Sequence, residues 1–195
     1  MPAFTPILIV TLTHALRALP LALCLLCSAL THGQAPESRS IHVVYASERY
    51  CGIQILEEWY SGAHPEMVNE FRLLDLKTMT EAHLKDLIVP SQKEQLLLTL
   101  NRQLAEHVAS WEVENTDGSL DDALAVLRNA VITEDDLWSL SISQSYASGA
   151  SQISISYTGG FLWYANRNME PSLELNDQEC RRFFLPELFS WCDIE

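Results

Sequence analysis

Apolar residues change their spacing along this chain of 195 residues, and the change occurs near residue 138. Before that point they mostly recur every three or four residues, which is typical of helices with one buried face. From Trp138 to Tyr146, and again from Ile153 to Tyr157, they alternate with polar residues, which is typical of strands with one buried face. Helices followed by neighbouring strands predict an α+β fold.

The clearest predicted helix covers residues 92–111. Ser91 and Glu94 have the spacing of a capping box, in which each side chain bonds the backbone N–H of the other residue. An apolar stripe follows at steps of three and four residues, formed by Leu97, Leu100, Leu104, Val108 and Trp111.

Helices are also predicted on both sides of this segment. Residues 48–60 place Cys51, Ile55, Leu56 and Trp59 on one helical face, and Met67, Phe71 and Leu74 continue at helical spacing after Pro65. A short helix is predicted from Thr80 to Leu87. Three later helix starts are predicted from their N-cap residues, which are Ser119 for a helix over 120–130, Thr133 for a brief turn, and Asn176 for a last helix interrupted near Pro186.

Strands are predicted in three places. Ile41 to Ala46 is short, β-branched and aromatic, and the two alternating runs after Trp138 form a hairpin. Gly159-Gly160 then leads into a third strand from Phe161 to Ala165. The expected architecture is a single small domain, in which a block of about four to five helices packs on a short antiparallel β-meander with an added N-terminal strand.

Residues 1–35 have the pattern of a secretory signal peptide. They contain no acid and one strong base, Arg17, and the apolar run from Ala18 to Leu30 is too short for a comfortable membrane span. Small residues offer cleavage sites near Ala29 and Ala35. We therefore expect residues 36–195 to fold as a single acidic α+β domain in the periplasm or outside the cell, with an uncleaved N-terminal anchor as the alternative.

Cleavage would leave Cys51, Cys180 and Cys192, which in an oxidising compartment predicts one disulfide bond and one thiol. One straight helix would separate Cys180 from Cys192 by about 18 Å, too far for a bridge. A long-range bridge from Cys51 is therefore favoured. The turn expected at Pro186 keeps the local pair open, and the absence of any bridge is the third option.

The chain has 12 Lys and Arg residues against 26 Asp and Glu residues, a formal net charge of −14. This balance excludes a nucleic-acid binder that works by charge. It fits either a soluble secreted protein or a surface that captures a cationic protein.

No motif predicts catalysis, a metal or a cofactor. Aligned to a calcium-binding EF-hand loop with Gly118 at position six, the chain has Val113 and Leu124 where oxygen ligands are needed. The histidines, which are His42, His64, His83 and His107 after cleavage, lack the spacing of zinc ligands. The sequence also lacks the Gly-x-Ser-x-Gly and Ser-x-x-Lys motifs of serine enzymes. These observations favour a protein that is not an enzyme.

Serines line one face of the predicted hairpin. The simple interpretation is a solvated sheet face, and the functional alternative is a hydroxyl-lined platform that docks a partner or a glycan. The candidate contact residues are Ser139, Ser141, Ser143, Ser145, Ser154, Ser156, Trp163 and Tyr164.

Together these features predict a secreted or periplasmic binding protein, such as an inhibitor, an immunity-type protein or an accessory factor, that engages a basic protein partner. It would meet the membrane only through its signal peptide, and its oligomeric state is left open. The alternatives are a small secreted hydrolase with an unidentified serine or carboxylate site, and a structural subunit of an envelope assembly.

Overall fold

The computed structural model describes residues 38–60, 65–147, 150–157 and 173–190. By their internal contacts these residues form two compact units, unit 1 up to Ala82 and from Glu187 onward, and unit 2 from His83 to Pro186. Helices and antiparallel sheets are both present, which confirms the α+β class. That residues 36–195 form one domain stays a prediction.

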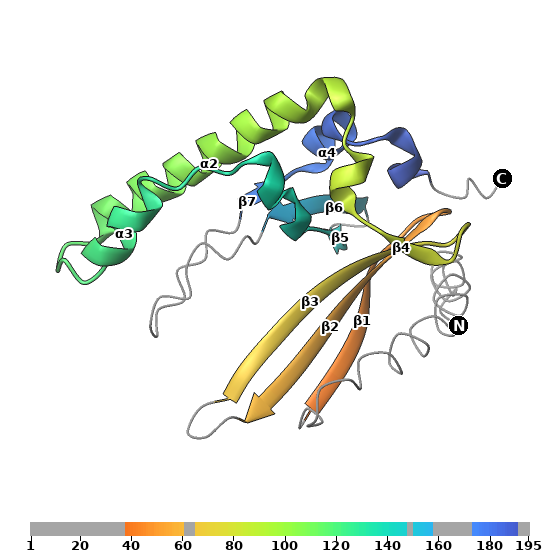
Figure 1. Cartoon of the computed structure of the whole chain (residues 1–195), viewed down its shortest axis with the longest axis horizontal. Helices are drawn as coiled ribbons and strands as arrows, with labels where there is room; N and C mark the ends of the chain where they lie inside the picture. The colour runs from red at the N-terminus through yellow and green to blue at the C-terminus, as the bar shows by residue number, and fades with distance from the viewer. Residues whose placement is uncertain (1–37, 61–64, 148–149, 158–172, 191–195) are drawn as a thin grey trace, which may run out of the picture. The chain divides into compact units, whose positions relative to one another are not determined.

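Unit 1 is built on an antiparallel sheet of four strands in the order β1-β2-β3-β4 (Figure 1). A cluster of apolar side chains, Cys51, Ile53, Ile55 and Leu74, is buried on one face of this sheet, with Ile41 and Leu76 packed against it. The bounds of the strands are β1 Ser38–Ala46, β2 Tyr50–Tyr60, β3 Pro65–Asp75 and β4 Thr80–Ala82.

The predicted helices over 48–60 and from Pro65 to Leu74 are wrong, because these segments are the strands β2 and β3. Cys51 and Ile55 are four residues apart, a spacing that fits a helix face and a strand face equally well. Ile53, between them, is buried as well, and this period of two identifies the strand. The N-terminal strand from Ile41 to Ala46 is confirmed within β1.

Unit 2 begins with short 3₁₀ turns and a long helix. The predicted helix from Thr80 to Leu87 is wrong, because β4 is followed by the 3₁₀ helix η1 (Leu84–Leu87). A second turn, η2 (Pro90–Gln92), leads into α2 (Lys93–Glu114), which confirms the helix predicted over 92–111. The predicted capping box is wrong because Ser91 lies inside η2, and the actual cap, Gln92, makes no capping bond with its side chain.

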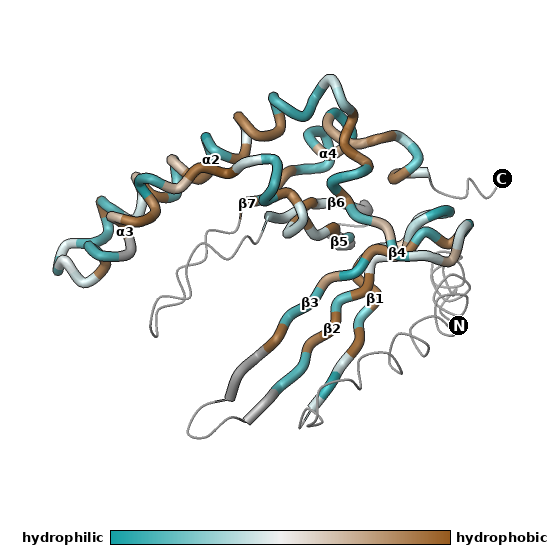
Figure 2. The backbone as a smooth tube through the Cα atoms, viewed as in Figure 1, coloured by the Kyte–Doolittle hydropathy of each residue, from teal (hydrophilic) through white to brown (hydrophobic). Residues whose placement is uncertain are grey.

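Helix α2 buries one side, formed by Leu96, Thr99, Leu100, Leu104 and Val108, and its polar and apolar residues alternate along the helix in Figure 2. Helix α3 (Asp121–Leu127) follows and contacts α2. Its N-cap is Leu120 rather than the predicted Ser119. The Asn115 side chain holds the turn instead, because its Oδ1 accepts from Leu120 N at 2.9 Å and its Nδ2 donates to Asp121 at 2.8 Å.

The sheet of unit 2 has three strands in the order β5-β6-β7, with bounds β5 Leu140–Ala147, β6 Ala150–Tyr157 and β7 Leu173–Leu175. The first two strands confirm the predicted hairpin. The third predicted strand, Phe161 to Ala165, lies outside the described residues. Trp138 was expected on the buried face of the hairpin, but it lies in the 3₁₀ helix η3 (Glu134–Ser139) with 69% of its surface exposed.

One face of this sheet is apolar and buried, and it carries Leu140, Ile142, Ile153, Ile155, Tyr157, Leu173 and Leu175. Helix α4 (Asp177–Phe183) contacts β6 and β7. Asn176 caps it through the predicted side-chain bond, and Thr133 likewise forms a capping box with Asp136 at the start of η3. The expected interruption near Pro186 is confirmed by η4 (Pro186–Phe189), within which the chain returns to unit 1.

Candidate functional site

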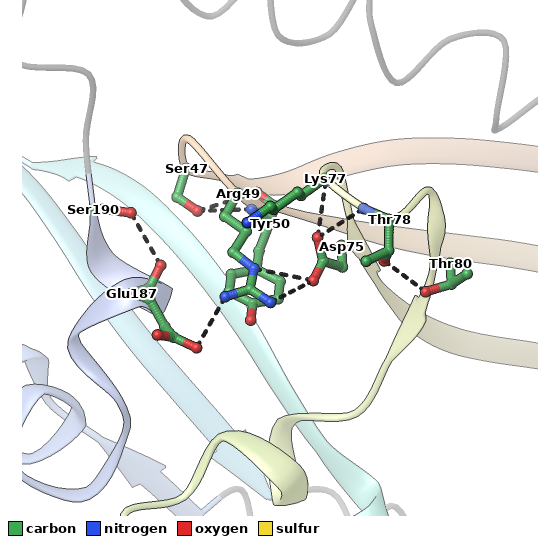
Figure 3. A network of polar contacts seen from close by, with 9 residues as sticks. All are labelled: Ser47, Arg49, Tyr50, Asp75, Lys77, Thr78, Thr80, Glu187 and Ser190. Carbon is green, nitrogen blue, oxygen red and sulfur yellow. Dashed lines mark hydrogen bonds and ion pairs between the residues drawn. The ribbon is translucent and has the colours of Figure 1, made fainter.

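The densest set of polar contacts in unit 1 joins the β1–β2 turn, the β3–β4 turn and η4 (Figure 3). Arg49 donates to Asp75 Oδ2 from Nε at 3.0 Å and from Nη2 at 2.9 Å. Its Nη1 donates to Glu187 Oε1 at 3.1 Å. The other carboxylate oxygen of Asp75 accepts from the backbone N–H of Lys77 at 2.8 Å and of Thr78 at 3.3 Å. We call these five residues the polar network.

The electrostatics of the polar network keep Asp75 ionised. Burial raises the pKa of Asp75, but the hydrogen bonds from Arg49 and from the two backbone N–H groups outweigh burial and hold this pKa below its usual 3.8. The same bond to Asp75 raises the pKa of Arg49. Both oxygens of this carboxylate are occupied by hydrogen bonds from Arg49 and from the backbone of the following turn, so we assign the network a structural role.

Further contacts attach the C-terminal segment to unit 1 beside the network. The hydroxyl of the buried Tyr45 donates to the carbonyl oxygen of Leu188, and Glu48 N donates to Ser190 O at 3.0 Å. Sequence analysis missed this constellation. Its one local signal is Asp75, which comes directly before a turn whose N–H groups it accepts, a common use of aspartate.

In unit 2, the predicted serine face exists on the hairpin. Ser141 pairs with Ser156 and Ser143 with Ser154 across β5 and β6, and the Oγ atoms of Ser143 and Ser154 are 3.1 Å apart. Ser145, opposite Gln152, is exposed. These hydroxyls lie on the face opposite the buried isoleucines, so strand alternation produces the predicted serine face.

Of the other three candidate contact residues, only Ser139 is described by the structure. Ser139 belongs to η3 rather than to the strand, and its hydroxyl donates to the carbonyl oxygen of Asp136 at 2.9 Å. Trp163 and Tyr164 lie outside the described residues. The structure therefore groups five of the candidate contact residues, which are Ser141, Ser143, Ser145, Ser154 and Ser156.

Acidic side chains of unit 2 gather at two exposed places. At the α2–α3 turn the exposed acids are Glu112, Glu114, Asp117, Asp121 and Asp122. Val113, on the same end of α2, exposes 79% of its surface. The second place is η3, where the exposed Glu134 and Asp135 precede the exposed Trp138. Each place therefore combines negative charge with an exposed apolar side chain.

The two cysteines that the structure describes show no sign of nucleophilic activation. Cys51 and Cys180 are buried free thiols, and Cys192 lies outside the described residues, so the disulfide stays a prediction. Burial raises the pKa of Cys51 to about 11 and that of Cys180 to about 12, which opposes formation of the thiolate.

The histidines that the structure describes lie on separate elements of the chain. His42 is exposed on β1, where its Nε2 lies 3.1 Å from Ser40 Oγ, and the His107 ring packs at a tilt against Trp111 on α2. His64 lies outside the described residues. Within the described ranges, no three His, Cys, Asp or Glu side chains gather as metal ligands would. None of the helices in those ranges has the length and apolar character of a membrane-spanning segment.

Comparisons with known proteins add little. No protein-family model matches the chain, and no curated protein matches it. Among solved structures, the chain is similar to the crystal structure of a DUF3298 family protein from Pseudomonas aeruginosa, with a TM-score of 0.46 and 15% sequence identity. The match covers 78% of this chain and 63% of that chain, so it spans less than two thirds of the other protein. At this similarity no residue role is carried over.

Proposed function

We propose that this chain is an exported protein without enzymatic activity, which binds a basic protein partner through the acidic surface of unit 2. An inhibitor, an immunity-type protein or an accessory factor of the periplasm or the cell exterior would have this activity. Export rests on the pattern of residues 1–35, and the choice of partner rests on charge.

The observation that supports the proposal most is the composition of the α2–α3 turn. Its acids face solvent, where they can attract a cationic surface over several ångströms. Val113, which is 79% exposed among them, offers apolar surface for a partner to cover. In a protein interface, charge increases the rate of encounter, and buried apolar area stabilises the complex. The α2–α3 turn offers both.

Two polar groups of unit 1, Asp75 and Ser47, are occupied by hydrogen bonds within the fold. Asp75 is held ionised by Arg49, and the hydroxyl of Ser47 is engaged with the backbone of Tyr50, accepting from its N–H at 3.0 Å. Both groups therefore serve the turns of unit 1 rather than a reaction.

Binding is tested by calorimetry of the purified protein with cytochrome c, a basic probe, in a series of sodium chloride concentrations. We expect an affinity that falls steeply with salt, because exposed charges are screened. An acidic probe protein should not bind. Binding to cytochrome c that ignores ionic strength would contradict recognition by charge, and so would turnover of a chromogenic ester or glycoside that one side-chain replacement abolishes.

Charge-neutralising variants locate the surface. Glu114→Gln with Asp122→Asn removes two charges at the α2–α3 turn, and Glu58→Gln with Glu81→Gln removes two from unit 1 as the matched control. We expect the first pair to weaken binding by about twofold to fivefold per charge. The control pair should change it less. Equal losses from both pairs would mean that only the net charge matters.

A further inference from the structure

An exposed tryptophan stands on a rigid part of unit 2. Trp138 exposes 69% of its surface, whereas Leu137 before it and Leu140 after it expose 1% and 4%. Leu137 therefore fixes η3 to the core while the indole of Trp138 is left in solvent. Large aromatic side chains in such positions are typical of the anchors of protein interfaces.

Asp135 lies on the same side of η3 as Trp138. In a 3₁₀ helix the side chains of residues i and i+3 eclipse one another, and the two are separated by about 6 Å along the axis. Asp135 and Trp138 have this spacing within η3, and both are exposed. A carboxylate and an indole are thus presented to solvent side by side.

The backbone that carries this pair is held at both ends. Thr133 donates to the carboxylate of Asp136 from its N at 2.7 Å and from its Oγ1 at 2.6 Å. Lys93 of α2 pairs with Glu134 at 2.5 Å, and the hydroxyl of Ser139 closes the other end on Asp136 O at 2.9 Å. A partner would therefore spend little conformational entropy on ordering η3.

We infer that Asp135 and Trp138 form the contact that receives an arginine side chain of the basic protein partner, an inference that rests on the proposed function. The guanidinium would stack on the indole face, where the ring quadrupole attracts a cation, and would donate to the Asp135 carboxylate one turn away. Arginine fits better than lysine, because its planar fork can stack and donate at the same time.

The test measures by calorimetry how tightly three basic probes bind the purified protein; the probes are hexa-arginine, hexa-lysine and cytochrome c. The wild type is compared with the single variants Trp138→Ala, Trp138→Phe and Asp135→Asn. The double variant Asp135→Asn with Trp138→Ala is measured as well. Leu98→Ala, which truncates an exposed apolar residue of α2 that belongs to neither acidic place, is the control, and thermal melts verify that each variant is folded. We expect Trp138→Ala and Asp135→Asn each to weaken hexa-arginine binding about twofold to fivefold. Trp138→Phe should lose less than Trp138→Ala, and the wild type should prefer hexa-arginine to hexa-lysine.

The two singles should also be coupled, so that the double variant loses less than the product of the single losses. If the wild type binds the basic probes and all η3 variants bind them as tightly as the wild type does, this inference fails and the proposed function stands. If the wild type binds no basic probe, both fail. Loss of binding to a saccharide or to lipid vesicles in Trp138→Ala, with basic probes unaffected, would also overturn the inference.

Discussion

Arg49 and Asp75 are joined by two hydrogen bonds to one carboxylate oxygen, of 3.0 and 2.9 Å, although 26 residues separate them in the chain. Asp75 is 6% exposed, and its second oxygen accepts two backbone N–H groups of the following turn. Arg49 also reaches Glu187, which is 138 residues away. One guanidinium thus connects the β1–β2 turn and the β3–β4 turn of unit 1 to the C-terminal segment.

Asp75→Asn is expected to lower the free energy of unfolding at pH 7 by about 2 kcal/mol, because it removes a charge-assisted hydrogen bond from a buried position. The pKa of Asp75 in the folded protein lies below 3.8, so its carboxylate stabilises the fold above that value and the stabilisation disappears as the pH falls through the folded pKa. The difference between wild type and variant should stay constant from pH 7 to about pH 5 and shrink below about pH 4.

Urea unfolding at a series of pH values measures this difference. Asp86→Asn, which changes an exposed carboxylate on η1, is the control and should change the free energy of unfolding by no more than about 0.5 kcal/mol. A difference between wild type and Asp75→Asn that grows on acidification would contradict the pKa direction.

The side chain of Asn101 on α2 supplies the hydrogen-bond partners for the backbone of Ile132, in the loop that follows α3. Its Oδ1 accepts from Ile132 N at 2.8 Å, and its Nδ2 donates to the carbonyl oxygens of Ile132 and Leu97, each at 2.9 Å. Ile132 is 2% exposed, so Asn101→Ala would leave buried backbone groups without partners. We expect a loss of about 2–3 kcal/mol in urea unfolding.

The matched control for Asn101→Ala is Asn129→Ala. Asn129 is exposed, and its amide donates to Ala125 O at 2.9 Å within its own helical turn. Its loss should stay within about 0.5 kcal/mol. Similar losses for both variants would show that the bridge to Ile132 contributes nothing specific.

Gly52 is required by close packing on β2. A Cβ atom at this position would lie 2.9 Å from Tyr45 Cβ and 3.1 Å from Phe71 Cε2. The Tyr45 Cβ is fixed by its backbone, so Gly52→Ala must shift β1 and should cost about 1–3 kcal/mol. Gln54→Ala on the same strand is expected to cost no more than about 1 kcal/mol. A melting temperature of Gly52→Ala equal to that of the wild type would show that β1 can shift without loss of stability.

These strands also show why part of the fold was not predictable. The hairpin β5–β6 alternates over most of its length, so its period of two was visible in the sequence. In β2, the spacing of Cys51 and Ile55 fits either period, and the deciding contacts come from β1 and β3. The polar network was not visible because Arg49, Asp75 and Glu187 are far apart in sequence and meet only in the folded chain.

The exposure of Trp138 was missed because the alternating pattern begins two residues before the first residue of β5.

Three predicted caps behave differently in the structure. Asn176 Oδ1 accepts from Glu179 N at 3.1 Å, and the Glu179 carboxylate accepts from Asn176 N at 3.1 Å. Asn176→Ala should therefore cost about 1 kcal/mol in urea unfolding. Ser91→Ala and Ser119→Ala should cost less than about 0.5 kcal/mol, because neither serine caps its helix. A loss of about 1 kcal/mol for Ser91→Ala would instead support the capping box that the sequence suggested.

Cys51 and Cys180 are expected to resist alkylation in the folded protein. Burial raises the pKa of Cys51 to about 11 and that of Cys180 to about 12. At pH 8 the Cys51 thiolate is then populated in about one molecule in a thousand, and the reagent must also reach a side chain that is 2% exposed. Peptide mapping after iodoacetamide treatment should show slow modification of both residues in buffer and fast modification in urea. Equal rates in the two conditions would contradict their burial. A non-reducing map that joins Cys51 to Cys180 or to Cys192 would restore the long-range bridge that the sequence favours, whereas a map that joins Cys180 to Cys192 would establish the local pair.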